Sequence, residues 1–436
     1  MQHSFDRRAF ARTGLAAVAA LAIAGGAKAQ DAPSEFNIGI FTFSSGPAAA
    51  YGMPGRQGAE LMIDMINEAG GVGGVPVRAT FVDEAQGAEG VISEYRRLAN
   101  DPDTQVMLAA LSSSNCLALA PVAEQIGMPT ISWNCDTHQL FLEDDLQFTF
   151  RPNGNTVPEF AAFAAYMVTV NPDVRRIAII NPDYAFGHDA GEIVKATLAA
   201  IAPEVEVVAE LYPRLGTSSF QTEISRLSAA RPDAIFSNLW GADLENFVRQ
   251  AQPRGLFNQS QVVLALGETV LESLNLPDGV IAGMLGDGWW NTPTARANPM
   301  TVEFTDAYLE RYGEHPVFPT MKMANALLFM QEAVEDAIAA TDGAWPTRAQ
   351  IAAAMEGRTF NSLTGTAVLR EDNDAVVDQV IGLTTNESDL GFTTLTSMVR
   401  YPGEMLMPPI GGDPIEWLST LTPDWLDSLP APGSYN

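Results

Sequence analysis

The chain has 436 residues, of which 47% are hydrophobic, and its mean hydropathy is +0.03. This length and apolar content allow a large buried core divided between two domains, and they exclude an intrinsically disordered chain. With 53 acidic and 24 basic residues, the formal net charge is −29. So acidic a surface repels phosphate backbones and anionic lipids, which argues against nucleic acid and membrane surfaces as partners.

The amino terminus indicates an export signal. Arg7 and Arg8 precede a mildly apolar run over residues 13–27, and Ala27-Lys28-Ala29 has the small-x-small form of a cleavage site. The arginine pair resembles the twin-arginine signal. We therefore expect residues 1–29 to be a twin-arginine-like signal peptide and the mature protein to be soluble in the periplasm. No cysteine follows the cleavage point, so no lipid anchor is expected.

The first elements after this segment predict a ligand-binding βαβ unit. An apolar strand is expected over residues 36–43, and a helix follows whose apolar positions fall on one side. The glycines of residues 70–74 end that helix as turn residues, and residues 75–82 form the next strand. The loop Ser44–Gly55 thus follows the carboxyl end of the first strand, where open parallel sheets bind ligands.

The alternation of helix and strand continues along the chain. Helices are expected over residues 89–100 and 115–126, and strands over residues 105–111 and 128–133. A second set of alternating elements is expected over residues 157–170, 175–181, 186–201, 205–211, 219–230, 234–239, 242–252 and 262–266. Further helices are expected over residues 300–312, 320–340 and 348–355, and short strands over residues 366–369, 379–384 and 396–401. This order predicts an α/β fold of two doubly wound parallel-sheet lobes.

Three crossovers are expected to join the two lobes, near residues 151–155, 285–289 and 362–366. The predicted domains are lobe 1 (residues 30–153 plus 288–364), lobe 2 (residues 154–287 plus 365–400) and a proline-rich C-terminal tail (residues 401–436). Two possibilities stay open for the tail, which either clasps the surface or hangs free.

Motifs of catalysis and metal binding are scarce. The histidines are far apart in the sequence. The sequence contains no zinc-protease motif, no C-x-x-C pair, no phosphate loop and no nucleophile elbow. We therefore expect no catalytic residue, no metal and no cofactor. Ser112, Ser113 and Ser114 follow a predicted strand and begin a helix, where hydroxyl and N–H groups suit a carboxylate. A plain serine N-cap without a ligand is the alternative.

The two cysteines, Cys116 and Cys135, follow consecutive predicted strands in a protein expected to reach an oxidising compartment. Their loops could therefore be neighbours, although spacing alone does not fix disulfide geometry. A disulfide and a pair of free thiols both stay open.

The order of several short motifs resembles that of the branched-chain amino-acid binding proteins. The motifs are SGP…YG…GAE…IN…GG, then SSS after the third strand, then a polar loop after Met128–Ser132. These are periplasmic receptors of the type I periplasmic-binding fold, which feed an ABC importer. The resemblance covers roughly residues 36–391. It implies a non-enzymatic, monomeric receptor that closes two lobes around an amino acid or a related amine or amide, and whose partner is the membrane permease.

The resemblance also implies a ligand site between the lobes. Ser113 and the loop after the fourth strand would hold the ligand carboxylate, and Glu268 would hold its ammonium. The implied ligand contacts are Tyr51, Ser112, Ser113, Asn134, Cys135, Asp136, Phe186, Trp240 and Glu268. Ordinary core packing is the alternative for Phe186 and Trp240, and a solvated surface acid is the alternative for Glu268.

One stretch departs from the pattern of that family, which has small residues and a threonine where this chain has Trp133-Asn134-Cys135-Asp136. The Asp136 carboxylate would repel a ligand carboxylate or add a partner for a cation. Amines, amides and polar amino acids are therefore options besides leucine. Trp289 and Trp290 would either add an aromatic wall or pack at the hinge. The rival functions are an amide- or amine-sensing receptor or regulator of the same fold and, more distantly, a secreted hydrolase.

Overall fold

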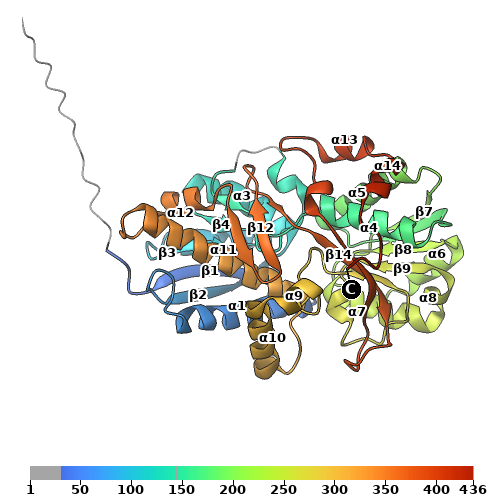
Figure 1. Ribbon diagram of the computed structural model, residues 1–436, viewed down its shortest axis with the longest axis horizontal. Coiled ribbons are helices and arrows are strands. Elements are labelled where there is room, and N and C mark those ends of the chain that lie inside the picture. Colours follow the sequence, from blue (N-terminus) through green and yellow to red (C-terminus); the bar gives the residue numbers. More distant parts are fainter. Residues whose placement is uncertain (1–30, 143–145, 436) are drawn as a thin grey trace, which may run out of the picture.

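The computed structural model describes residues 31–142 and 146–435 and shows two α/β lobes side by side (Figure 1). The predicted signal peptide, residues 1–29, lies outside the described residues. Within the described ranges, no helix is long and apolar enough to cross a membrane.

Lobe 1 is built on a five-stranded sheet whose order is β2-β1-β3-β4-β5. All its strand pairs are parallel. The strands are β1 (Phe36–Thr42), β2 (Val77–Asp83), β3 (Thr104–Leu108), β4 (Thr130–Ile131) and β5 (Thr149–Phe150). Strand β3 is buried along its whole length and β1 along nearly all of it, as the apolar runs in the sequence predict.

The helices of lobe 1 come from two separate parts of the chain. The first part supplies η1 (Glu84–Gln86), α1 (Ala49–Glu68), α2 (Gly87–Ala99), α3 (Ser113–Ile126) and η2 (His138–Phe141). The second part supplies α9 (Pro293–Ala297), α10 (Pro299–Tyr312), α11 (Phe318–Ala340) and α12 (Arg348–Met355). Helix α11 packs directly on α1. A Cβ atom at Gly58 would lie only 2.7 Å from the Thr320 carbonyl oxygen, so this close packing requires a glycine.

Helix α1 begins earlier than the sequence predicts. Residues up to Gly55 were expected to form a loop, but the helix starts at Ala49 and includes Pro54. Tyr51 therefore lies in its first turn. The glycine and proline content of this stretch favours a loop locally. The helix forms nevertheless, and Gly58 allows it to pack closely against α11. The glycines of residues 70–74 do form a turn, with positive φ at Gly70, Gly71, Gly73 and Gly74.

Lobe 2 is built on a seven-stranded sheet whose order is β15-β14-β10-β9-β8-β6-β7. The strands are β6 (Arg176–Ile180), β7 (Glu206–Leu211), β8 (Ala234–Ser237), β9 (Gln261–Leu264), β10 (Ile281–Gly283), β14 (Gln379–Thr385) and β15 (Thr394–Tyr401). The last two strands pair antiparallel, so this sheet is mixed rather than wholly parallel. Its helices are α4 (Thr156–Val170), α5 (Ala185–Ile201), α6 (Gln221–Ala230), α7 (Gly241–Ala251) and α8 (Leu256–Gln259), with η3 (Gln252–Arg254) and η4 (Gly267–Val270).

The third crossover lies later in the chain than expected. Strands β11 (Thr359–Ser362), β12 (Gly365–Leu369) and β13 (Ala375–Val376) form a separate antiparallel sheet, and β11 packs on α11. Residues 362–366 therefore make a hairpin turn within this small sheet. The chain enters the large sheet of lobe 2 only at Gln379.

The C-terminal tail clasps the surface. It forms η5 (Gly403–Met405), α13 (Pro414–Ser419) and α14 (Pro423–Ser428), and both helices pack on α5 (Figure 1). Leu406 and Leu418 are fully buried. The Tyr435 hydroxyl donates a hydrogen bond to Thr294 Oγ1 over 2.7 Å, which ties the end of the tail to α9.

Cys116 in α3 and Cys135 after β4 are joined as a disulfide, with their Cα atoms 6.2 Å apart. Of the two alternatives that the sequence leaves open, the structure has the bonded one. The bridge joins the two lobe 1 segments that carry Ser113 and Asp136, and it closes a loop with a sequence separation of 19.

Replacing both cysteines by alanine should lower the free energy of unfolding by about 3 kcal/mol, because the bridge restricts the unfolded chain. Urea unfolding followed by circular dichroism measures this change. A reductant should destabilise the wild type to the same extent and leave the double variant unaffected. Equal stability of the oxidised wild type and the variant would contradict a structural role for the bridge.

Candidate functional site

A cavity lies where the carboxyl ends of the two sheets face each other, the position that open parallel sheets favour for ligands. Its walls lie close together and leave about 10 Å³ for the centre of a water-sized molecule, which is room for about one water. Lobe 1 contributes Tyr51, Leu111, Ser113, Asn134 and Asp136, and lobe 2 contributes Tyr184, Phe186, Trp240 and Leu266. Both lobes are therefore needed to form the cavity.

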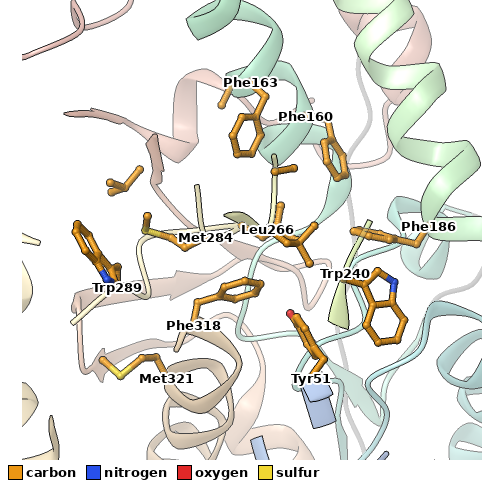
Figure 2. Packing of buried hydrophobic residues seen from close by; sticks show 14 of the residues in the cluster. Tyr51, Phe160, Phe163, Phe186, Trp240, Leu266, Met284, Trp289, Phe318 and Met321 are labelled. Carbon is orange, nitrogen blue, oxygen red and sulfur yellow. The ribbon is translucent and has the colours of Figure 1, made fainter. Parts of the chain in front are cut away.

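Aromatic side chains from the two lobes meet in this cavity. The Tyr51 ring lies between Phe318 and Trp240 (Figure 2), with centroids 5.5 Å and 5.3 Å away. The Tyr51 hydroxyl donates to Asn134 Oδ1 over 3.3 Å, and Trp240 Nε1 donates to the Tyr184 hydroxyl over 3.1 Å. The rings thus bury apolar surface while their polar ends are hydrogen-bonded.

The amino end of α3 offers donors to an anion. The N–H groups of Ser113 and Ser114 and the Ser113 hydroxyl donate to no protein atom in the described part of the chain. The preceding N–H groups, those of Leu111 and Ser112, donate to the Glu84 carboxylate over 2.7 Å and 3.2 Å. Because a helix amino end also carries partial positive charge, a ligand carboxylate fits beside Ser113.

A buried lysine contacts Asp136 behind the cavity wall. Lys322 Nζ, from α11, lies 3.0 Å from Asp136 Oδ1 and 3.5 Å from Glu159 Oε1 in α4. All three side chains are at most 5% exposed. Burial raises the pKa of Glu159 to about 8, and the nearby Asp136 charge adds to the shift, while Lys322 opposes it.

A second buried ion pair positions the loop that carries Asp136. Arg151 reaches both carboxylate oxygens of Asp374, each over 2.8 Å. Its remaining terminal nitrogen donates to the carbonyl oxygens of Cys135 and Thr137 over 2.9 Å and 2.5 Å. The two carbonyls flank Asp136, so the Arg151 guanidinium fixes the backbone on either side of it.

The lobes also touch beside the cavity. Asp189, in α5 of lobe 2, accepts hydrogen bonds from Thr137 Oγ1 over 2.5 Å and from Gln139 Nε2 over 2.6 Å, both in lobe 1. A further contact joins His315 of lobe 1 to Glu272 of lobe 2, with His315 Nδ1 lying 2.7 Å from Glu272 Oε1. Polar contacts across the gap of this kind fit a closed arrangement of the two lobes.

Six of the residues proposed from the sequence line the cavity together. They are Tyr51, Ser113, Asn134, Asp136, Phe186 and Trp240. Three others are not part of its wall. Ser112 donates its N–H to Glu84, and Cys135 is fully buried in the disulfide. Glu268 is buried and accepts the N–H of Phe318 over 3.0 Å, and burial raises its pKa to about 8.

Sequence reasoning did not single out Leu111, Tyr184 and Leu266, although each follows a strand and lies within two residues of a candidate that it did select. It also missed Lys322 and Glu159 behind the wall. Both had a recognisable signal, because each is a charged residue within the apolar part of its helix.

Trp289 and Trp290 do not line the cavity. Trp289 is buried near Met284 and Met321 (Figure 2), and Trp290 stacks on His315 with ring centroids 4.1 Å apart. The structure therefore supports hinge packing for this pair. No group of three or more histidine, cysteine or acidic side chains in the described ranges is arranged to hold a metal ion.

Two lobes that together line a cavity with aromatic walls and free N–H donors at a helix amino end define the class of two-lobed solute-binding proteins. Comparison with known proteins agrees with this class. The model of the periplasmic binding protein family matches residues 35–385. The chain therefore belongs to the periplasmic binding protein family.

The relatives and structural neighbours are binding proteins. The leucine-specific-binding protein of Salmonella typhimurium is 26% identical over 63% of this chain and 72% of its own. A solute-binding protein of an ABC transporter from Rhodopseudomonas palustris BisB5, in complex with 3,4-dihydroxybenzoic acid, matches with a TM-score of 0.72 and 21% identity over 85% of this chain and 97% of its own. A branched-chain amino acid transporter substrate-binding protein of Streptococcus pneumoniae, in complex with isoleucine, has a TM-score of 0.67 and 17% identity over 84% and 99% of the two chains.

The raised pKa values of Glu159 and Glu268 predict a pH dependence of stability. Both carboxyls ionise near pH 4.5 when unperturbed and at about pH 8 in the folded protein. Between these values the folded protein binds more protons than the unfolded chain, so stability should fall as pH rises from about 5 to 8. Each group contributes up to about 1.4 kcal/mol per pH unit.

Melting temperatures measured between pH 5 and pH 8 test this dependence. The double variant Glu159→Gln/Glu268→Gln should show a flatter slope, because its amides carry no proton to lose. Surface charge repulsion is shared by both proteins and cancels in the comparison. Identical slopes in the variant and the wild type would refute the assignment.

Proposed function

We propose that the protein is the substrate-binding receptor of an ABC importer and that it acts in the periplasm as a monomer. It binds an amino acid or a related small polar solute between its lobes and presents the closed form to the membrane permease. Closure is stabilised to the extent that the ligand binds the closed form more tightly than the open one. We infer no enzymatic step.

The observation that carries this proposal is the lining of one cavity by residues from both lobes. Ser113 and the amino end of α3 suit a carboxylate, whereas Asp136 suits a group that donates hydrogen bonds. Tyr51, Phe186 and Trp240 supply apolar walls between these polar ends. Together these groups match the chemistry of a short ligand with a polar group and an apolar part.

Two ligand classes suit these walls. Amino acids match the ligands named for several relatives, and aromatic acids match those bound by several structural neighbours. Both classes would place a carboxylate at Ser113. They differ at Asp136, because only the amino acid brings a positive charge to it.

A thermal-shift screen of the mature protein against amino acids, amines, amides and aromatic acids should find solutes that raise the melting temperature, since they bind the folded form. Trp240→Ala should weaken the best ligand by about 2 kcal/mol or more in calorimetry, because it removes a central aromatic wall. Trp425→Ala, in the tail, is the matched control and should keep the wild-type affinity. If no solute raises the melting temperature while an ester or amide is turned over, the receptor function is refuted.

A further inference from the structure

The ion pairs behind the cavity do not balance in charge. Three carboxyl groups, those of Asp136, Glu159 and Asp374, share two cationic groups, those of Arg151 and Lys322. All five side chains are nearly inaccessible to solvent. Since an unpaired buried charge is costly, the empty site favours one additional proton within this cluster.

The contacts indicate which carboxyl carries that proton. Arg151 occupies both oxygens of Asp374, and Asn155 Nδ2 donates to the same carboxylate over 2.6 Å. Lys322 lies closer to Asp136 than to Glu159, at 3.0 Å against 3.5 Å. Glu159 Oε2 is buried and has no hydrogen-bond partner in the described part of the chain. Glu159 therefore holds the proton, and the cluster is neutral when the cavity is empty.

Few other groups near Glu159 could balance the negative charge of its carboxylate. The titratable or charged groups that face it or its partners are Lys322 from α11, Asp136 from the loop after β4, Arg151 from the first crossover, Asp374 from the turn between β12 and β13, Tyr51 from α1, Tyr184 after β6, His138 in η2 and Asp189 in α5. Asp189 is bonded to Thr137 and Gln139, and His138 Nδ1 lies 3.0 Å from Thr156 Oγ1. Lys322 is thus the cation closest to Glu159 in the described ranges.

We propose that the ligand presents a cationic nitrogen to Asp136 and that Glu159 releases its proton to the solvent when this nitrogen binds. This inference rests on the proposed function, since it concerns the same cavity. The Glu159 acid becomes a carboxylate, its proton passes to water or buffer, and the cluster gains one negative charge. That charge is balanced by the ligand cation beside Asp136, with Lys322 between the two carboxylates.

Glu159 is therefore a positioning residue that selects the charge of the ligand without touching it. A carboxylic acid without a cationic nitrogen does not favour the ionisation of Glu159 when it binds. Such a ligand brings its charge towards Asp136 without compensation. The inference thus favours amino acids and amines over simple aromatic acids, and it makes binding stronger at higher pH.

Titration calorimetry with ligands of matched skeleton but different charge tests the inference. One series is L-phenylalanine, phenethylamine and 3-phenylpropanoate, and the other is L-leucine, 3-methylbutylamine and 4-methylpentanoate. Measurements at pH 7 in phosphate and in Tris give the number of protons released. The amine-bearing ligands should release about one proton each, and their affinity should rise about tenfold between pH 6 and pH 7.

Two glutamine variants separate this role from a structural one. Glu159→Gln should abolish proton release and flatten the pH dependence. Glu268→Gln, which alters a buried glutamate of similarly raised pKa outside the cavity wall, should keep the proton release.

Binding of the amines without proton release would overturn the inference and leave the receptor function standing. Acids that bind as tightly as the amine-bearing ligands, or amine-bearing ligands that do not bind at all, would also overturn it. If no solute of the wider panel binds, the proposed function itself fails.

Discussion

The buried ion pair between Arg151 and Asp374 is the contact on which the geometry of the cleft depends. It joins the first crossover to the residues just before the third, and it holds the carbonyl groups on both sides of Asp136. The backbone adds to this link, because Arg151 N donates to Asn373 O and Ala375 N donates to Arg151 O. Removing one partner would leave a buried charge uncompensated, which is strongly destabilising. The hinge and one wall of the cavity are therefore a single connected structure.

This connection explains why charged residues stand behind a cavity with largely aromatic walls. Asp136 faces the cavity at the end of a chain of buried contacts that runs through Lys322 to Glu159 and, by way of the backbone, to Arg151. Buried ionic groups cost desolvation energy, but in fixed geometry they define one arrangement of the loop. The aromatic contact of Tyr51 with Trp240 joins the two lobes at the cavity wall itself.

Much of the fold could be predicted from hydrophobic periodicity. The helix over residues 348–355 has the predicted bounds, and most other boundaries differ by one or two residues. The start of α1 was missed because its glycines and Pro54 favour a loop locally, whereas close packing on α11 stabilises the helix. Strand direction was not predictable for β14, since its side-chain pattern is the same in parallel and antiparallel sheets.

The wall of the cavity was largely predictable because its residues follow strands, and parallel strands end at one edge of a sheet. Lys322 and Glu159 were not, since they are 163 residues apart and meet only through packing. The placement of Glu268 likewise depends on where α11 begins, because its carboxylate binds the N–H of Phe318 instead of facing the cavity.

Hydrogen exchange followed by mass spectrometry, with and without a solute that raises the melting temperature, tests the central claim that ligand binds between the lobes. Slowed exchange is predicted in residues 111–116 and 134–137 of lobe 1 and, at the same time, in residues 184–187 and 239–242 of lobe 2. These segments contain cavity residues of both lobes. Protection confined to one lobe, or to the hinge around residues 285–288, would contradict the account.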